Sequence, residues 1–122
     1  MQLLDFGNQL IKKDIKRLKK RFKSLEDDLG NYFIIHKNTW TANDRLSCEV
    51  FACSKYLVCK ERIGIAHPET KPSKGGRLWF VIIKNTGHYI RCLFYAANEE
   101  KKYPKRVCYK IVNSQIESLL QT

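Results

Sequence analysis

Residues 71–77 of this 122-residue chain form a short segment that combines basic side chains with two adjacent glycines. The segment ends in Lys74-Gly75-Gly76-Arg77, and six hydrophobic residues, 78–83, follow directly. A short run of β-branched and aromatic residues is typical of a strand that is buried on both faces. Basic groups held at the end of such a rigid strand are well placed to bind a polyanion.

Lysine and arginine in this position could support cleavage of RNA without a metal ion. RNA carries its own nucleophile, the ribose 2′-hydroxyl, and charge develops on the phosphate during attack. Cationic side chains aimed at that phosphate stabilise the charge. A tyrosine or lysine whose pKa is lowered by neighbouring cations could remove the hydroxyl proton. Carboxylates are scarce in the strand region, which argues against a two-metal nuclease.

The overall charge also indicates a polyanionic partner. Lysine and arginine outnumber aspartate and glutamate by 23 to 12, which gives a net charge of +11. Such a balance favours nucleic acid, an anionic membrane surface or an acidic protein as the partner. The alternative is a charge that serves solubility alone. Eight of the twelve residues from 12 to 23 are basic, so a helix there would carry either a nucleic-acid contact or a solvated face.

The cysteines and the hydropathy pattern limit the other classes of protein. The five cysteines, at 48, 53, 59, 92 and 108, form no Cys-x-x-Cys pair, so we expect neither a metal site nor another cofactor. There is no signal-peptide pattern, and no apolar run approaches the roughly 18 residues of a membrane span. We therefore expect one domain, residues 1–122, with reduced thiols in the cytoplasm and no membrane partner.

The first third of the sequence predicts helices. Apolar residues at 11, 15, 18, 22, 25 and 29 follow a helical spacing. Ser24 and Asp27 resemble a capping box, which favours two helices that break near Lys23 and Ser24, the second ending near residue 35. The two helices could pack as a hairpin, or their apolar residues could form one continuous stripe. Residues 1–6 could be an edge strand or the start of a helix, and we expect a loop over 36–47.

The remaining sequence predicts strands followed by a helix. Residues 51–66 alternate in polarity, which places Lys60 and Arg62 on one face. Strands 77–84 and 88–95, the latter containing Arg91, are joined by a three-residue turn that ends in glycine. Pro104 suits the first turn of a final helix.

These elements predict an α+β fold in which an N-terminal helical pair packs on an antiparallel β-meander of three to four strands, with a C-terminal helix. We expect the helices to cover one sheet face. The other face would carry Lys60 and Arg62, with Arg77 at the entry to its strand.

The segment 74–82 resembles the basic, glycine-containing strand of the RelE/ParE toxin superfamily, in particular its RelE and HigB branches. Residues 93–100 are similar to the end of the next strand in those toxins, and the order of the predicted elements is similar too. The resemblance implies a RelE-like toxin of a type II toxin–antitoxin system. Its activity would be metal-independent, ribosome-dependent endoribonuclease cleavage of mRNA, and its partner an acidic antitoxin protein.

The resemblance also implies roles for individual residues. Arg77 matches the arginine that contacts the scissile phosphate, and Lys74 and Lys71 match basic loop positions before it. Tyr103 lies near a tyrosine that some members use in catalysis. We therefore expect Arg77, Lys74 and Tyr103 in catalysis. The expected RNA-binding residues are Lys60, Arg62, Lys71 and Arg91, of which Lys60 and Arg62 match basic positions on the preceding strand.

Two other functions fit the same residues. One is a non-catalytic basic module of the same fold that binds nucleic acid or protein. The other is a ParE-like inhibitor of DNA gyrase. For the strand residues the structural alternatives are an Arg77 paired to a carboxylate and an Arg91 in a cross-strand ion pair.

Overall fold

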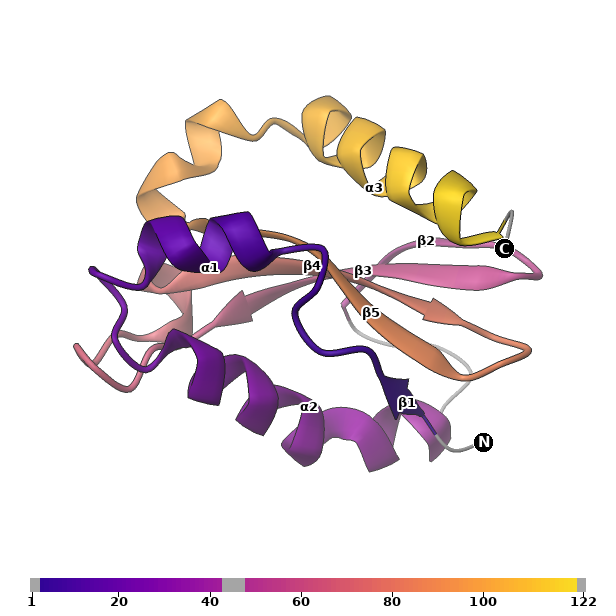
Figure 1. Ribbon diagram of the computed structural model, residues 1–122, viewed down its shortest axis with the longest axis horizontal. Coiled ribbons are helices and arrows are strands. Elements are labelled where there is room, and N and C mark those ends of the chain that lie inside the picture. Colours follow the sequence, from indigo (N-terminus) through magenta and orange to yellow (C-terminus); the bar gives the residue numbers. More distant parts are fainter. Residues whose placement is uncertain (1–2, 43–47, 121–122) are drawn as a thin grey trace.

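The structure is a computed structural model that describes residues 3–42 and 48–120. Within these residues the chain adopts an α+β fold whose elements follow in the order shown in Figure 1. They are β1 (Leu4–Asp5), α1 (Lys12–Leu18), α2 (Leu25–Ala42), β2 (Glu49–Ala52), β3 (Tyr56–Ile63), the 3₁₀ helix η1 (Pro72–Lys74), β4 (Gly76–Ile83), β5 (His88–Ala96), the 3₁₀ helix η2 (Ala97–Lys102) and α3 (Lys105–Leu120).

The sheet has the strand order β1-β5-β4-β3-β2 in the part of the chain that is described. Strands β2 to β5 form an antiparallel meander, which confirms the predicted one. Strand β1 pairs in parallel with the start of β5, with Leu4 opposite His88. The sheet is therefore mixed, and of the two alternatives for the N-terminus the edge strand is correct.

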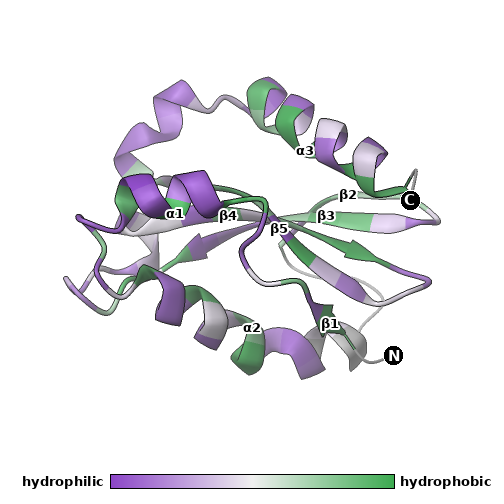
Figure 2. Ribbon diagram, in the orientation of Figure 1, coloured by the Kyte–Doolittle hydropathy of each residue, from purple (hydrophilic) through white to green (hydrophobic). Residues whose placement is uncertain are grey.

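Helices cover both faces of the sheet, so the expectation of one covered face is wrong. Helices α1 and α2 pack on one face, where Phe22, Leu25 and Phe80 belong to one buried cluster. Helix α3 packs on the other face, where Cys108 and Val112 lie in a second cluster with Trp79. Figure 1 shows the sheet between these helices, and Figure 2 shows hydrophobic segments alternating with hydrophilic ones along α2 and α3. Every residue of β4 is buried as a result.

Two predicted boundaries need correction. Helix α2 runs to Ala42 rather than residue 35, because Trp40 packs on the sheet and extends the apolar stripe beyond the polar residues near 37. The loop expected over 36–47 is thus helical to Ala42, and 43–47 lie outside the described residues. The extended segment 51–66 is two strands, β2 and β3, and Cys53 N donates to Tyr56 O across the turn (3.0 Å).

The elements of the motif gather at one end of the molecule. The end of β3, η1, the start of β4 and η2 lie together, and Ala97 N donates to Gly75 O (2.9 Å). Strand β1 and the C-terminal end of α3 lie toward the opposite end (Figure 1). We call the end where β3, η1, β4 and η2 meet the basic end. Its cations are the exposed ones of α1, η1 and η2 together with Lys60, Arg62 and Arg77.

The two glycines of the motif permit a close approach of backbones at the basic end. A Cβ atom on Gly75 would overlap the carbonyl oxygen of Ile63, and one on Gly76 would overlap the ring of Phe94. The first obstacle is backbone, which cannot rotate away as a side chain does. Glycine at 75 is therefore required for η1 to lie against the end of β3.

We predict that Gly75→Ala lowers the free energy of unfolding by about 2–3 kcal/mol, because the added methyl group forces η1 away from β3. Gly30→Ala is the matched control, since nothing lies within 4 Å of a Cβ there and the position is inside α2. It should raise stability by about 0.5–1 kcal/mol. Urea denaturation followed by circular dichroism measures both. Equal effects of the two variants would contradict the close approach.

Candidate nucleic-acid interface

Arg77 is the most deeply buried cation of the basic end, with 4% of its surface exposed. Its Nη1 donates to Pro72 O (3.1 Å) and Gly76 O (3.2 Å), and its Nη2 donates to Ser73 O (3.1 Å). Its Nε donates to Glu100 Oε1 (3.1 Å). The guanidinium therefore closes the η1 turn onto β4, and the structure shows the pairing of Arg77 with a carboxylate.

Lys60 shares that carboxylate. Its Nζ donates to Glu100 Oε1 (3.2 Å) and lies 5.8 Å from the centre of the Trp79 ring. The strand register places Lys60 opposite Trp79 and Arg62 opposite Arg77, so these cations occupy the same sheet face, as the alternation predicts. Lys60 and Arg77 thus both donate to a single oxygen atom of Glu100.

The surroundings of Glu100 favour its charged form. Burial acts to raise the pKa of this carboxyl, but hydrogen bonds from Lys60 and Arg77 and the charges of both outweigh it. The pKa of Glu100 therefore lies below its ordinary value of 4.5. The carboxylate is an anion at neutral pH, held by two cations from neighbouring strands.

The other predicted loop and strand cations are exposed. Lys71 and Lys74 flank the residues of η1 that hold Arg77, and Arg62 is exposed at the end of β3. All three belong to the same end of the molecule as Arg77 because β3, η1 and β4 meet there. The structure thus brings Lys60, Arg62, Lys71, Lys74 and Arg77 together.

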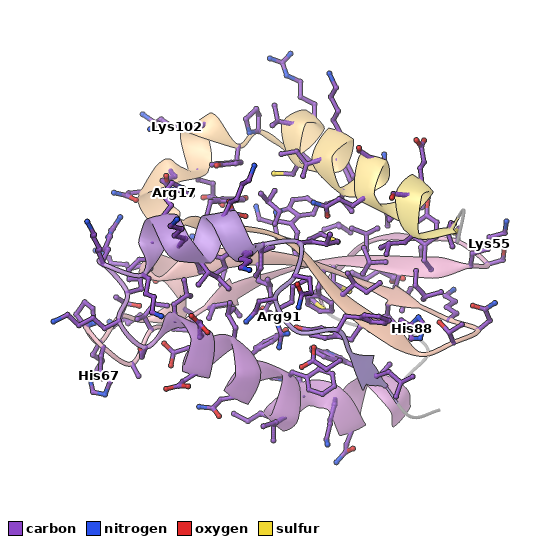
Figure 3. The ribbon with its side chains drawn as sticks, viewed as in Figure 1. Arg17, Lys55, His67, His88, Arg91 and Lys102 are labelled. Atoms are coloured by element: carbon purple, nitrogen blue, oxygen red, sulfur yellow. The ribbon has the colours of Figure 1, made fainter. Side chains whose placement is uncertain are left out.

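Arg91 is not part of this group. It is 1% exposed and lies on the α1–α2 face, where its Nη1 donates to Asp5 Oδ1 (2.9 Å) and its Nη2 to Leu29 O (3.1 Å). The reason is a register shift between Trp79 and Phe80, which places Arg91 opposite Phe80. Figure 3 shows Arg91 inside the molecule, away from Arg17 and Lys102. The expectation that Arg91 joins the other cations is therefore wrong, and it forms the cross-strand ion pair instead.

Tyr103 packs instead of projecting freely. Its ring stacks on that of Tyr95, with centroids 4.4 Å apart and planes 4° from parallel. Burial raises the pKa of Tyr103, and it also raises that of Tyr95 to about 12. A general base needs the opposite shift. The expected lowering of a tyrosine pKa by surrounding cations does not occur here.

Helix α1 and the turn after it extend the basic end. All eight basic residues between 12 and 23 are exposed, as the amphipathic pattern predicts. Arg17 Nη1 forms an ion pair with Glu99 Oε2 (2.5 Å), and Arg21 Nη1 donates to Asn98 Oδ1 (2.8 Å). These contacts fix Arg17 and Arg21 beside η2, the element that also supplies Glu100 to Arg77. Figure 3 shows Arg17 and Lys102 on the same side.

Sequence reasoning missed the acceptors of η2. Asn98, Glu99 and Glu100 each hold a cation that comes from a distant part of the chain. The signal was two adjacent glutamates shortly after β5, in a chain whose 12 acidic residues are outnumbered by 23 basic ones. Only the folded arrangement shows which cations they meet.

No family model, curated protein or solved structure matches the chain. In the part of the chain that the structure describes, no helix is long and apolar enough to cross a membrane. No group of three or more histidine, cysteine or acidic side chains is placed to hold a metal ion in residues 3–42 and 48–120. The case for a function therefore depends on the residues of the basic end.

We predict that Arg77→Ala lowers the free energy of unfolding by about 2–4 kcal/mol, because it leaves buried carbonyl oxygens without a donor. Arg62→Ala, at the exposed position opposite Arg77, is the matched control and should change stability by less than about 0.5 kcal/mol. Thermal and urea unfolding measure the difference. Two variants of equal stability would contradict the structural role of Arg77.

The lowered pKa of Glu100 predicts a pH dependence. Because that pKa is depressed in the folded state, the carboxylate stabilises the fold above pH 4.5, its ordinary value, and the contribution is lost as pH falls further. Because the Glu100 side chain is 44% exposed, wild type should exceed Glu100→Gln in stability at neutral pH by only about 0.5 kcal/mol, and the gap should close as the pH falls below 4.5. Urea titrations across this range test it. A gap that persists in acid would contradict the ion pairs. The control is Glu69→Gln, which removes a carboxylate at an exposed position of the loop before η1.

Proposed function

We propose that this chain is a RelE-like toxin of a type II toxin–antitoxin system, a ribosome-dependent endoribonuclease that cleaves mRNA through the RNA 2′-hydroxyl. One observation carries the proposal. The Lys74-Gly75-Gly76-Arg77 motif lies at the end of a buried strand, where cations from β3, η1 and α1 gather. Such a concentration of charge fits the phosphate backbone of RNA.

The arrangement of elements also supports the proposal. A helical pair, an antiparallel meander and a C-terminal helix follow one another along the chain, and this α+β order is compatible with a RelE-like fold. The acidic antitoxin of the proposal would be attracted by the net charge of +11. Its natural target is the exposed basic face of α1 and η1, since it would there compete with RNA.

The proposed chemistry is electrostatic in the first place. Arg77, fixed by the carbonyl oxygens of η1, would stabilise charge on the phosphate as the 2′-oxygen bonds to phosphorus and the bond to the 5′-oxygen breaks, with Lys74 and Lys60 beside it. Water would take the proton of the 2′-hydroxyl and supply one to the leaving 5′-oxygen. Lys71 and Arg62 would hold the flanking phosphates. Tyr103 would serve as a packing group near the scissile nucleotide, because its raised pKa makes it a poor base.

A second candidate function is a non-catalytic RNA-binding module on the same fold. The observation that favours it is the engagement of Arg77, whose guanidinium is hydrogen-bonded to backbone carbonyls and to Glu100. Such a module would bind RNA through the exposed lysines, with affinity that falls steeply as salt rises.

The test of the proposal is cleavage of mRNA on purified ribosomes. We predict that wild type cuts ribosome-bound mRNA, arrests growth when expressed alone in a bacterial host, and leaves free mRNA intact. Lys71→Gln combined with Lys74→Gln should slow cleavage by about 100-fold while the fold is kept, because both side chains are exposed. The control, Lys55→Gln combined with Lys110→Gln, removes the same charge at exposed positions of the β2–β3 turn and α3.

Three outcomes separate the candidates. An absence of cleavage and of growth arrest with wild type would overturn the toxin proposal. RNA binding without cleavage, with a salt slope of roughly 0.7 per phosphate contact, would select the binding module. Accumulated DNA breaks with intact mRNA would instead select a gyrase inhibitor.

A further inference from the structure

The 3₁₀ helix η2 supplies acceptors to cations from several elements at the basic end. Glu99 pairs with Arg17 of α1, and Asn98 accepts from Arg21 in the α1–α2 connection. Glu100 pairs with Lys60 of β3 and Arg77 of β4. A short segment of this protein therefore occupies the space where its cations converge, as a bound polyanion would.

Glu100 is the member of η2 that can leave without disrupting the local fold. Glu99 also accepts from Ala96 N (2.9 Å), so its carboxylate fixes the start of η2. The hydrogen bonds that the structure gives to the Glu100 side chain come from Lys60 and Arg77, whereas its backbone oxygen accepts from Tyr103 N (3.1 Å). Its side chain is 44% exposed, whereas that of Arg77 is 5% exposed. Partly exposed ion pairs contribute little net stability, so this carboxylate is readily displaced.

The cations of the site would keep their places if Glu100 moved away. Backbone carbonyls of Pro72, Ser73 and Gly76 hold both terminal nitrogens of Arg77. Only its Nε is directed at the carboxylate. The Lys60 ammonium lies over the Trp79 ring, which attracts a cation independently. Departure of Glu100 would thus uncover a preorganised pair of donors.

We propose that Arg77 and Lys60 form a phosphodiester site that Glu100 closes in the free protein, and that a single-stranded RNA backbone opens the site by displacing this carboxylate. The shared oxygen, Glu100 Oε1, lies 3.1 Å from Arg77 Nε and 3.2 Å from Lys60 Nζ, and it marks the position of a phosphate oxygen. The proposal rests on the proposed function for its ligand, RNA, and adds an internal competitor that regulates access.

The surroundings favour a chain of phosphates over a single anion. Lys71 and Lys74, at η1, and Lys101 and Lys102, in η2, are exposed, and these two 3₁₀ helices contact each other. One carboxylate satisfies two central cations and leaves these four lysines solvated. A single strand of RNA, with a charge at every nucleotide, would neutralise the central and flanking cations together.

The experiment measures how Glu100→Gln changes affinity for a short, uncleavable 2′-O-methyl RNA. Glutamine keeps the size of the side chain and can still accept from Arg77, but it carries no charge. We expect about tenfold tighter binding in fluorescence anisotropy. Glu69→Gln removes the same charge from an exposed position of the loop before η1, and it should change affinity by less than about twofold.

Equal effects of Glu100→Gln and Glu69→Gln would overturn the proposal, since they would reflect net charge alone. A second readout uses the Arg77 Nε–H resonance, which RNA should shift in wild type and in Glu100→Gln; no shift in either protein would also overturn it. Adding Lys60→Gln to Glu100→Gln should abolish most of the increase in RNA affinity that Glu100→Gln produces.

The same titration with an acidic peptide identifies the class of ligand. If Glu100→Gln increases affinity for the peptide more than affinity for RNA, RNA is rejected as the natural occupant of the site. The ribosome cleavage assay is independent of these measurements. Tight RNA binding by Glu100→Gln without any cleavage would refute the proposed enzyme but leave the closed site established. Cleavage of mRNA by wild type without a specific effect of Glu100→Gln on RNA affinity would support the proposed enzyme and refute the closed site.

Discussion

Burial of β4 on both faces is the constraint on which the rest of this structure depends. Every residue from Gly76 to Ile83 is buried, so apolar elements have to cover each side of the sheet. Helices α1 and α2 meet this demand on one side and α3 meets it on the other. Arg77 is the second residue of this strand, so the packing that makes β4 rigid also fixes the position of the guanidinium. This fully buried strand therefore also positions the most deeply buried cation of the basic end.

Much of the fold could be predicted because its signals are local. The β4–β5 hairpin, the helix break before Leu25 and the start of α3 after Pro104 each depend on neighbouring residues. The side of the sheet that α3 covers could not be predicted, because Cys108, Val112 and Ile116 give the helix an apolar stripe without indicating where it packs. The length of α2 was missed for a related reason, since its last contact, between Trp40 and the sheet, is tertiary.

The residues of the candidate site also divide into those that a local pattern placed correctly and those that it did not. Strict alternation placed Lys60 and Arg62 correctly, because β3 pairs with β4 without interruption. Arg91 was misplaced because one irregularity between Trp79 and Phe80 shifts the register with β5, and a shift of one residue moves a side chain to the opposite face. The partner of Arg77 lies 23 residues away in η2, beyond the reach of any local pattern.

The location of β1 and of the end of α3 has a practical consequence for measurement. Strand β1 and the last turn of α3 lie away from η1 and η2, toward the opposite end of the molecule (Figure 1). A tether or fluorophore attached beside either element would leave the cations facing the solution. Surface-immobilised and single-molecule formats are therefore compatible with this protein, and both could hold it in one orientation while large assemblies approach from the free side.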